Sequence, residues 1–259
     1  MKKEAKKFAC RCIQHWSSSR GTALAENDVV AMEPPSAPTS VTNKPKPRGP
    51  HGQQDPHGDL DPERLIKVAL QHDREGRYEL ALKTLAEGIA RFPDAAQLYG
   101  VRASLRLRNQ QTSLALSDLE KAVELEPDDA AIRVNRAQAY RAFGRFDEAM
   151  SDLDTAVQHS PDLIPARFNR GALLYARGDF DKALVDFEHC IAVDPHAPAP
   201  YFNRASTYWE LGRSEEALAD LQRFVDLADE AEWKKAAEDL MQNWKTALSR
   251  EAEAAKTDS

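Results

Sequence analysis

Residues 130–163 read AAIRVNRAQAYRAFGRFDEAMSDLDTAVQHSPDL, and this stretch decides the fold. Apolar residues and alanines recur every three or four positions on both sides of Gly144, a pattern that predicts two amphipathic helices joined by a turn. Pro161 is expected to end the second helix, because proline has no N–H to donate and its ring clashes with the preceding turn. A lone helical hairpin cannot bury its apolar faces, so the stretch predicts similar neighbours along the chain.

The pattern recurs with a period of thirty-four residues. This spacing is shared by a proline at the end of a unit, a small residue within the second helix, a large apolar residue after it, and a glycine between the helices, for which Gln110 is the one exception. In chain order these are Pro93, Pro127, Pro161 and Pro195; Ala81, Ala115, Ala149, Ala183 and Ala217; Leu85, Leu119, Leu153, Phe187 and Leu221; and Gly76, Gly144, Gly178 and Gly212. The pattern predicts five units, at 62–95, 96–129, 130–163, 164–197 and 198–231.

A thirty-four-residue helix–turn–helix with this order of small, large and proline positions resembles the tetratricopeptide repeat family. The resemblance implies an all-α fold, a right-handed α-solenoid of five tetratricopeptide-like hairpins whose core lies between neighbouring units. The chain departs from the family at two positions of the first helix. Leu65, Tyr99, Arg133, Arg167 and Tyr201 stand where the family has Trp, and an arginine replaces the usual leucine in four units.

Each of these four arginines is accompanied by an aspartate. Units two to five pair Arg102, Arg136, Arg170 and Arg204 with Asp118, Asp152, Asp186 and Asp220, always sixteen residues further on. Unit one has neither charge and carries Val68 and Thr84 at these positions. Charges that occur and vanish together predict a partly buried, structural ion pair between the two helices of each hairpin.

The segments on either side of the repeats differ from them in composition. Residues 1–61 are predicted to be a disordered arm, because a basic stretch is followed by a Pro- and Gly-rich linker with almost no large apolar residues. Residues 232–257 are predicted to form one helix that caps the open end of the solenoid, with Trp233, Leu240 and Trp244 on its apolar stripe. A partner-binding helix that uses Trp244 is the alternative.

The beginning of the chain bears on the compartment. Its first twenty residues are basic and Ser-rich, as in a transit peptide, and Ala23-Leu24-Ala25 has the form of a signal-peptidase site but follows no apolar segment. No run of eighteen apolar residues occurs, so we expect no membrane span. We expect a cytoplasmic protein, with targeting to an organelle or export as the alternatives.

Charge and motifs exclude several classes of function. Residues 61–259 contain 26 Lys and Arg against 36 Asp and Glu, a net charge of −10 that disfavours nucleic acid as a partner. The chain has no phosphate-binding Gly-rich loop, no His-Glu-x-x-His and no recognisable nucleophile motif. Cys10, Cys12 and His15 do not supply the four ligands of a zinc site, and Cys190 occupies a small-residue position that predicts burial. We therefore expect no enzymatic activity, no cofactor and no metal.

The predicted binding site lies on the first helix of each unit, which lines the concave side of a solenoid. Asn135, Asn169 and Asn203 recur there at thirty-four-residue spacing, and the resemblance implies that this asparagine holds the main chain of a bound peptide. Aromatic and arginine side chains, typical of binding hot spots, are expected on or beside the same face: Phe168, Tyr175, Phe202, Trp209, Arg108 and Arg141. A solvated or locally bonded polar face is the alternative for the asparagines, and packing between repeats for some of the aromatics.

These residues predict a non-enzymatic adaptor that binds an extended segment of a partner protein. The Hsp70/Hsp90-type carboxylate clamp of some family members is not expected, because the positions beside the asparagines supply no lysine. The first alternative is a scaffold that builds an oligomer or a secretion or envelope complex through the convex face or the terminal helix. The second alternative is a regulatory subunit of an enzyme.

Overall fold

The computed structural model describes residues 61–257, and within them eleven helices follow one another without a strand. Five pairs of helices precede one long terminal helix. The helices are α3 (Pro62–Arg74), α4 (Tyr78–Arg91), α5 (Ala96–Arg108), α6 (Thr112–Leu125), α7 (Ala130–Ala142), α8 (Phe146–His159), α9 (Ile164–Arg177), α10 (Phe180–Val193), α11 (Pro198–Glu210), α12 (Ser214–Leu227) and α13 (Ala231–Thr257). The all-α solenoid that the sequence predicts is confirmed.

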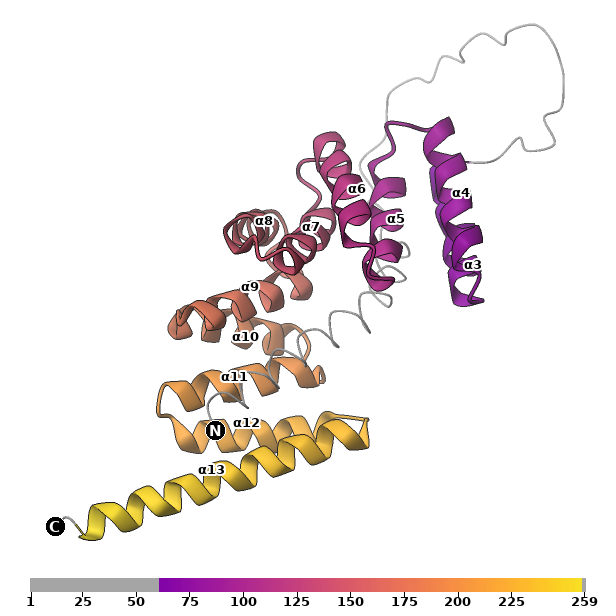
Figure 1. The fold of residues 1–259 in the computed structure, drawn as a ribbon. Helices are drawn as coiled ribbons and strands as arrows, with labels where there is room; N and C mark the ends of the chain where they lie inside the picture. Colours follow the sequence, from indigo (N-terminus) through magenta and orange to yellow (C-terminus); the bar gives the residue numbers. More distant parts are fainter. Residues whose placement is uncertain (1–60, 258–259) are drawn as a thin grey trace, which may run out of the picture.

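The helices form a curved stack of antiparallel hairpins that runs from α3 and α4 at one end to α13 at the other (Figure 1). Within each unit the two helices pack along their length, and the second helix then packs on the first helix of the next unit. The first helices of successive units, α3, α5, α7, α9 and α11, also contact one another. We call these five helices the inner layer, and α4, α6, α8, α10 and α12 the outer layer.

The turns between the two helices of a unit need a residue with a left-handed backbone. Gly76, Gly144, Gly178 and Gly212 take φ values of 73°, 72°, 87° and 74° there. Glycine accepts this conformation without a steric penalty because it has no Cβ. Gln110 occupies the same place in unit two with φ of 60°, so the shape of the turn is kept even where the glycine is missing.

The core is made of small and large residues that alternate along the stack. Alanines such as Ala81, Ala115 and Ala149 have no exposed surface and let neighbouring helices approach closely. Leu85, Leu119 and Leu153 fill the space between them and are equally buried. The predicted columns of the repeat are therefore the columns of the core, which consists of four apolar clusters along the stack, each shared by neighbouring units.

The terminal helix α13 covers the end of the solenoid, as the sequence predicts. It packs on α12, and its buried residues Ala237, Met241 and Trp244 join the apolar cluster of unit five. The ring of Trp244 lies parallel to that of Trp209 in α11, with the centroids 4.4 Å apart. The side chains of residues 249–254 are exposed, and the last turns of the helix extend past the body of the stack (Figure 1).

Candidate partner-binding site

Four arginines of the inner layer each grip one aspartate of the outer layer. In units two to five, Nε and Nη2 of the arginine donate to the two carboxylate oxygens of the aspartate sixteen residues later, over distances of 2.6 to 2.9 Å. The pairs are Arg102 with Asp118, Arg136 with Asp152, Arg170 with Asp186, and Arg204 with Asp220. The aspartates are buried, so each pair stabilises a hairpin only while both partners are present.

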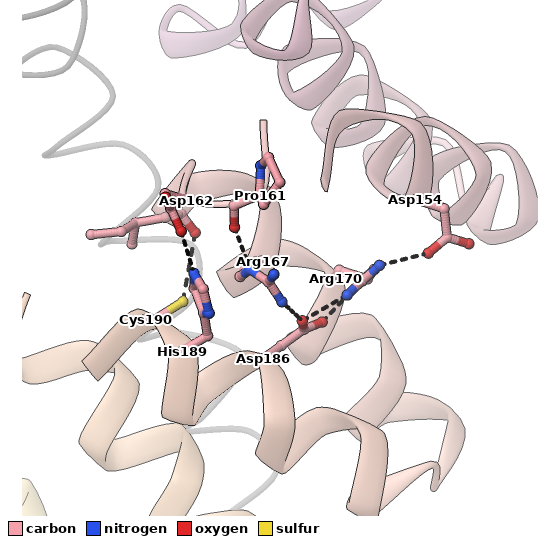
Figure 2. A network of polar contacts seen from close by, with 9 residues as sticks. Asp154, Pro161, Asp162, Arg167, Arg170, Asp186, His189 and Cys190 are labelled. Carbon is pink, nitrogen blue, oxygen red and sulfur yellow. Dashed lines mark hydrogen bonds and ion pairs between the residues drawn. The ribbon is translucent and has the colours of Figure 1, made fainter. Parts of the chain in front are cut away.

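A second arginine reaches the same aspartate in three units. Arg133 and Arg167 donate from Nη1 to Asp152 and Asp186, at 2.9 and 3.1 Å, and Arg106 reaches Asp118 at 2.6 Å. Figure 2 shows this arrangement around Asp186, where both arginines converge on one carboxylate. The hydrogen bonds to Asp152 and Asp186 hold the pKa of Arg136 and of Arg170 above the usual range of arginine.

The position that holds Trp in the family has a shared role in this chain. Its side chain donates a hydrogen bond to the carbonyl of the proline that ended the preceding unit, always six residues earlier. The donors are Tyr99, Arg133, Arg167 and Tyr201, and the acceptors are Pro93, Pro127, Pro161 and Pro195. Tyrosine and arginine can both make this hydrogen bond, because each carries a donor at the end of a long side chain. The sequence shows that Trp is replaced at this position, but it does not show the hydrogen bond to the proline carbonyl.

The charges also connect neighbouring units. Asp154 in α8 accepts a hydrogen bond from Nη1 of Arg170 in α9 over 3.1 Å (Figure 2). Glu120 and Glu188 stand thirty-four residues on either side of Asp154 and interact with Arg136 and Arg204. We call the arginine–aspartate pairs of units two to five, together with the acids at positions 120, 154 and 188, the charge ladder. The recurrence of an acid at positions 120, 154 and 188 is a signal in the sequence that the predicted site did not include.

The three asparagines of the predicted site do not form a uniform exposed row. Asn169 and Asn203 are only 1% and 3% exposed, and each donates to the backbone carbonyl four residues earlier in its own helix. Asn135 is half-buried and donates to the hydroxyl of Ser104 on the neighbouring inner helix, at 3.1 Å. Only Asn135 therefore keeps an accessible side chain, and the local bonding of the other two follows the alternative that the sequence left open.

The predicted aromatic anchors lie in the core instead of on an open face. Phe168 and Phe202 have no exposed surface and pack edge-on against Phe187 and Phe224 of the outer layer. Tyr175 is buried against Phe180, and burial raises the pKa of its hydroxyl. Large aromatic side chains remove more apolar surface from water when they pack between helices than when they stay on the surface, which accounts for this difference.

The remaining predicted site residues also have partners within the chain. Trp209 is half-buried by its stacking on Trp244 of α13. Arg108 forms an ion pair with Asp73 of α3, and Arg141 donates from Nη1 to Asn169 at 2.9 Å. Both arginines thereby tie neighbouring inner helices together. Two half-buried polar side chains of the inner layer in unit three, Asn135 and Gln138, lie next to Ser104 of unit two or in the position equivalent to it.

No group of three or more His, Cys, Asp or Glu side chains with the geometry of a metal site occurs in residues 61–257. Cys190 is buried, its thiol pointing toward the carbonyl of Ile164 (Figure 2), and burial raises its pKa to about 12. Cys10, Cys12 and His15, together with the predicted disordered arm, lie outside the described residues. Among the described helices, none is long and apolar enough to cross a membrane.

Sequence models described as tetratricopeptide repeat match residues 101–164, 164–197 and 199–230. These matches fall on the same register as the hairpins from α5 to α12. The chain is a tetratricopeptide repeat protein. Unit one, at α3 and α4, lies outside the matched residues but repeats the same hairpin. Tetratricopeptide repeat proteins are protein–protein interaction modules, and this is the general class of function to which the chain belongs.

Solved structures of other tetratricopeptide repeat proteins have the same fold. YrrB, described as a TPR protein with an unusual peptide-binding site, is 21% identical, with a TM-score of 0.55 over 69% of this chain and 92% of that one. TTC0263 of Thermus thermophilus is 22% identical, with a TM-score of 0.54 over 73% of this chain and 99% of that one. MamA is 16% identical, with a TM-score of 0.55 over 64% of this chain and 90% of that one. A comparison with curated proteins gives no match.

Proposed function

We propose that the chain is a non-enzymatic adaptor that binds an extended segment of a partner protein on its inner layer, at α5 and α7. The observation that carries the proposal is the bond between Asn135 and Ser104 on adjacent inner helices. It fixes the amide of Asn135 through its NH₂ group and leaves the side-chain carbonyl without a donor among residues 61–257. A carbonyl held in this way is suited to accept an N–H of a peptide main chain.

The neighbouring side chains extend this site. Gln138 stands thirty-four residues after Ser104 on the next inner helix and offers a second donor and acceptor. Arg108 and Arg141 add positive charge at the two sides, each held by an inner-layer partner. Each net hydrogen bond contributes only about 1 kcal/mol, so the polar residues fix the register of a bound segment more than its affinity. YrrB, a relative in fold with a described peptide-binding site, supports the same general use of the repeats.

The test is capture of partners from cell lysate by the full-length chain and by two double variants. The first variant, Asn135→Ala with Gln138→Ala, removes polar groups from the inner layer of unit three. The matched control, Ser151→Ala with Gln158→Ala, removes polar groups from exposed positions of α8 in the same unit. Thermal melting of all three proteins checks that the folds are equally stable.

Partners that bind wild type and the α8 variant, but are lost from the α7 variant, place the site on the inner layer. Mass spectrometry then identifies the bound proteins, and a synthetic peptide from the shared segment gives the affinity. Retention of the same partners by the α7 variant contradicts the proposal. Loss from the α8 variant alone moves the site to the outer layer.

A scaffold is the second candidate, because the stack has exposed apolar residues at one edge. Phe143 and Phe146 lie on either side of the Gly144 turn and are 46% and 52% exposed. Large apolar side chains grouped in this way are typical of protein contacts. Light scattering of wild type and of Phe143→Ser with Phe146→Ser decides this candidate: a multimer that the substitutions dissociate favours the scaffold, and a monomer in both excludes self-assembly through this edge.

A further inference from the structure

The first residues of the chain have a pattern that the repeats do not use. Between Lys2 and Trp16, apolar or small residues recur at spacings of three and four: Ala5, Phe8, Ala9, Cys12, Ile13 and Trp16. At 100° per residue these positions fall on one side of a helix. Lys3, Lys7 and Arg11 fall on the opposite side, Lys6 lies at the boundary, and Lys2 falls within the apolar side. The segment contains five basic residues and one acidic residue, a net charge of +4. Such a sequence is suited to bind a surface that is apolar in the middle and acidic around it.

The end of the solenoid at α11 to α13 offers a surface of that kind. Trp209, Trp233 and Leu240 are half-buried there and pack against the apolar cluster of unit five. Trp233 and Leu240 lie on the same stripe of α13 as Trp244, which stacks on Trp209 of the inner layer. The apolar part of this surface therefore continues from α13 onto the inner layer.

The charge of this end is opposite to that of the N-terminal segment. Residues 194–239 contain eleven Asp and Glu against five Lys and Arg. Two of the basic residues are already used, Arg204 by Asp220 and Arg213 by Glu216. The acidic residues nearest to the apolar surface in the sequence are Glu210 after Trp209 and the run Asp229, Glu230 and Glu232 before Trp233. A cationic segment is attracted to this end more than to any neutral part of the inner layer.

A buried polar group at the same end has no partner among the described residues. The hydroxyl of Tyr175 in α9 is shielded from water and makes no hydrogen bond within residues 61–257. Burial, and after it the negative charge of Glu210, raise the pKa of this hydroxyl, so the carboxylate is close. A buried hydroxyl without a partner is destabilising, and a donor bound between Tyr175 and Glu210 removes that cost.

The length of the intervening chain allows the two regions to meet. Forty-four residues, 17–60, separate the segment from Asp61 before α3. As a flexible chain they span about 40 Å on average and at most about 150 Å. Five steps between inner helices, each about 10 Å, separate α3 from α13 by about 50 Å. A tether of this length gives the segment an effective concentration of about a millimolar at the far end of the solenoid.

We propose that residues 2–16 dock on their own chain, at the surface formed by Trp209, Trp233 and Leu240. The stripe of Phe8, Ile13 and Trp16 covers the apolar residues, and Lys3, Lys6 and Lys7 face Glu210 and the Asp229–Glu232 run. This intrachain contact goes beyond the proposed function, because it requires no partner protein. It also lies at the C-terminal end of the solenoid, away from the proposed peptide site at α5 and α7.

The experiment uses the full chain with a spin label on the segment. Cys12→Ser leaves Cys10 as the accessible thiol, because Cys190 is buried and its raised pKa keeps it unreactive. The readout is the ¹⁵N-indole N–H signal of each tryptophan, assigned by Trp→Phe substitution, before and after reduction of the label. Trp16 lies close to the label in the sequence and serves as an internal positive control.

Docking predicts that Trp209 and Trp233 lose most of their intensity until the label is reduced. Lys3→Glu, Lys6→Glu and Lys7→Glu together are expected to restore these signals. The matched triple Lys44→Glu, Lys46→Glu and Arg48→Glu makes the same change of net charge within the linker and is expected to leave the broadening in place. On the receiving side, Asp229→Lys, Glu230→Lys and Glu232→Lys should act like the first triple.

Unbroadened Trp209 and Trp233 signals in the labelled wild type overturn the proposal. So does an equal effect of the N-terminal and linker charge-reversal triples, which indicates unspecific attraction. Contact with a second copy is tested in a mixture of two chains, one that carries the spin label but no ¹⁵N and one that carries ¹⁵N but no spin label. Broadening of the same strength in that mixture also contradicts docking within one chain. None of these results depends on partner capture, so the proposed function stands or fails separately.

Discussion

Gly171 and Phe187 are matched in size across the hairpin of unit four. A Cβ at Gly171 would lie 2.9 Å from Cε1 of Phe187, which is closer than Cβ atoms approach other atoms in folded proteins, and a tight 3.2 Å from Cβ of Asp186. The other units place an alanine and a leucine at these two positions: Ala69 with Leu85, Ala103 with Leu119, Ala137 with Leu153, and Ala205 with Leu221. The larger ring in the outer layer is thus accommodated by the loss of one methyl group in the inner layer.

Gly171→Ala is therefore expected to lower the free energy of unfolding, by about 1–3 kcal/mol for an overpacked core. Phe187→Leu alone leaves a space and should cost about 1 kcal/mol. The double variant recreates the Ala–Leu pair found in unit three. Its loss in free energy of unfolding should be smaller than the sum of the losses of the two single variants. Urea unfolding of the four proteins measures the coupling, and strictly additive effects would contradict it.

Gln110 is strained by its turn, since an L-residue other than glycine is disfavoured at φ of 60°. Gln110→Gly is expected to raise the stability by up to about 1 kcal/mol, the gain in the turn being partly offset by the greater freedom of glycine in the unfolded chain. Gly144→Ala is the matched opposite change, because a Cβ there meets nothing within 4 Å and only the backbone is affected. It should cost about 1 kcal/mol. Equal stability of Gln110→Gly and wild type would show that the turn tolerates glutamine without strain.

The ion pair of unit three is expected to behave as one element. Asp152→Ala removes the carboxylate that both Arg136 and Arg133 reach and should cost about 3–5 kcal/mol. Arg136→Ala leaves Asp152 paired with Arg133 and should cost less. Arg136→Val with Asp152→Thr reproduces the residues of unit one and should cost much less than the two single changes together. In unit one, the Thr84 hydroxyl donates to the carbonyl of Leu80, so the polar atom is satisfied within its helix. Urea melts decide, and additive losses would sink the hypothesis of a shared pair.

Cys190 makes stability depend on pH in the alkaline range. Burial raises the pKa of its thiol from the ordinary value of 9.0 to about 12. The unfolded chain loses this proton first, so the contribution of the neutral thiol is complete below pH 9.0 and declines as the pH rises toward about 12. Cys190→Ala, which restores the alanine found at this position in units two and three, should flatten this decline. A slope of stability against pH that is the same in both proteins between pH 9.0 and about 12 would contradict the assignment.

The fold was accessible from the sequence because every unit repeats the same physical problem. A hairpin that cannot bury its own faces needs a small residue where helices touch, a large one between them and a glycine at the turn, and these requirements recur at a fixed period. Even the exception at Gln110 was visible, although its backbone conformation was not. The sixteen-residue spacing of Arg136 and Asp152 likewise placed the two side chains at positions that meet across the hairpin.

The binding site was less accessible, because a position in the repeat does not reveal how far its neighbours cover it. Asn135, Asn169 and Asn203 are equivalent in sequence, yet Ser104 and Arg141 engage the first two differently and only Asn135 remains half-exposed. Phe168 and Phe202 were expected beside a groove, but aromatic rings on a first helix pack just as well against the outer layer. Whether such a side chain is buried depends on which residues surround it in the folded protein, and its position within the repeat does not specify them.

The charge ladder does not extend to unit one, so the two ends of the solenoid differ in how they are stabilised. Unit one has no arginine–aspartate pair between its own two helices, and Ala86 stands where units two to four carry the acid that interacts with the next hairpin. Its two helices are held by apolar contacts, by the ion pair between Asp73 and Arg108 of α5, and by the bond from Tyr78 to Gln111, which lies between α5 and α6. In a stack stabilised by nearest neighbours, the terminal unit with the weakest links opens first. Amide protons of α3 and α4 should therefore exchange with solvent before those of α7 to α10, and proteolysis should shorten the folded body from this end, one hairpin at a time.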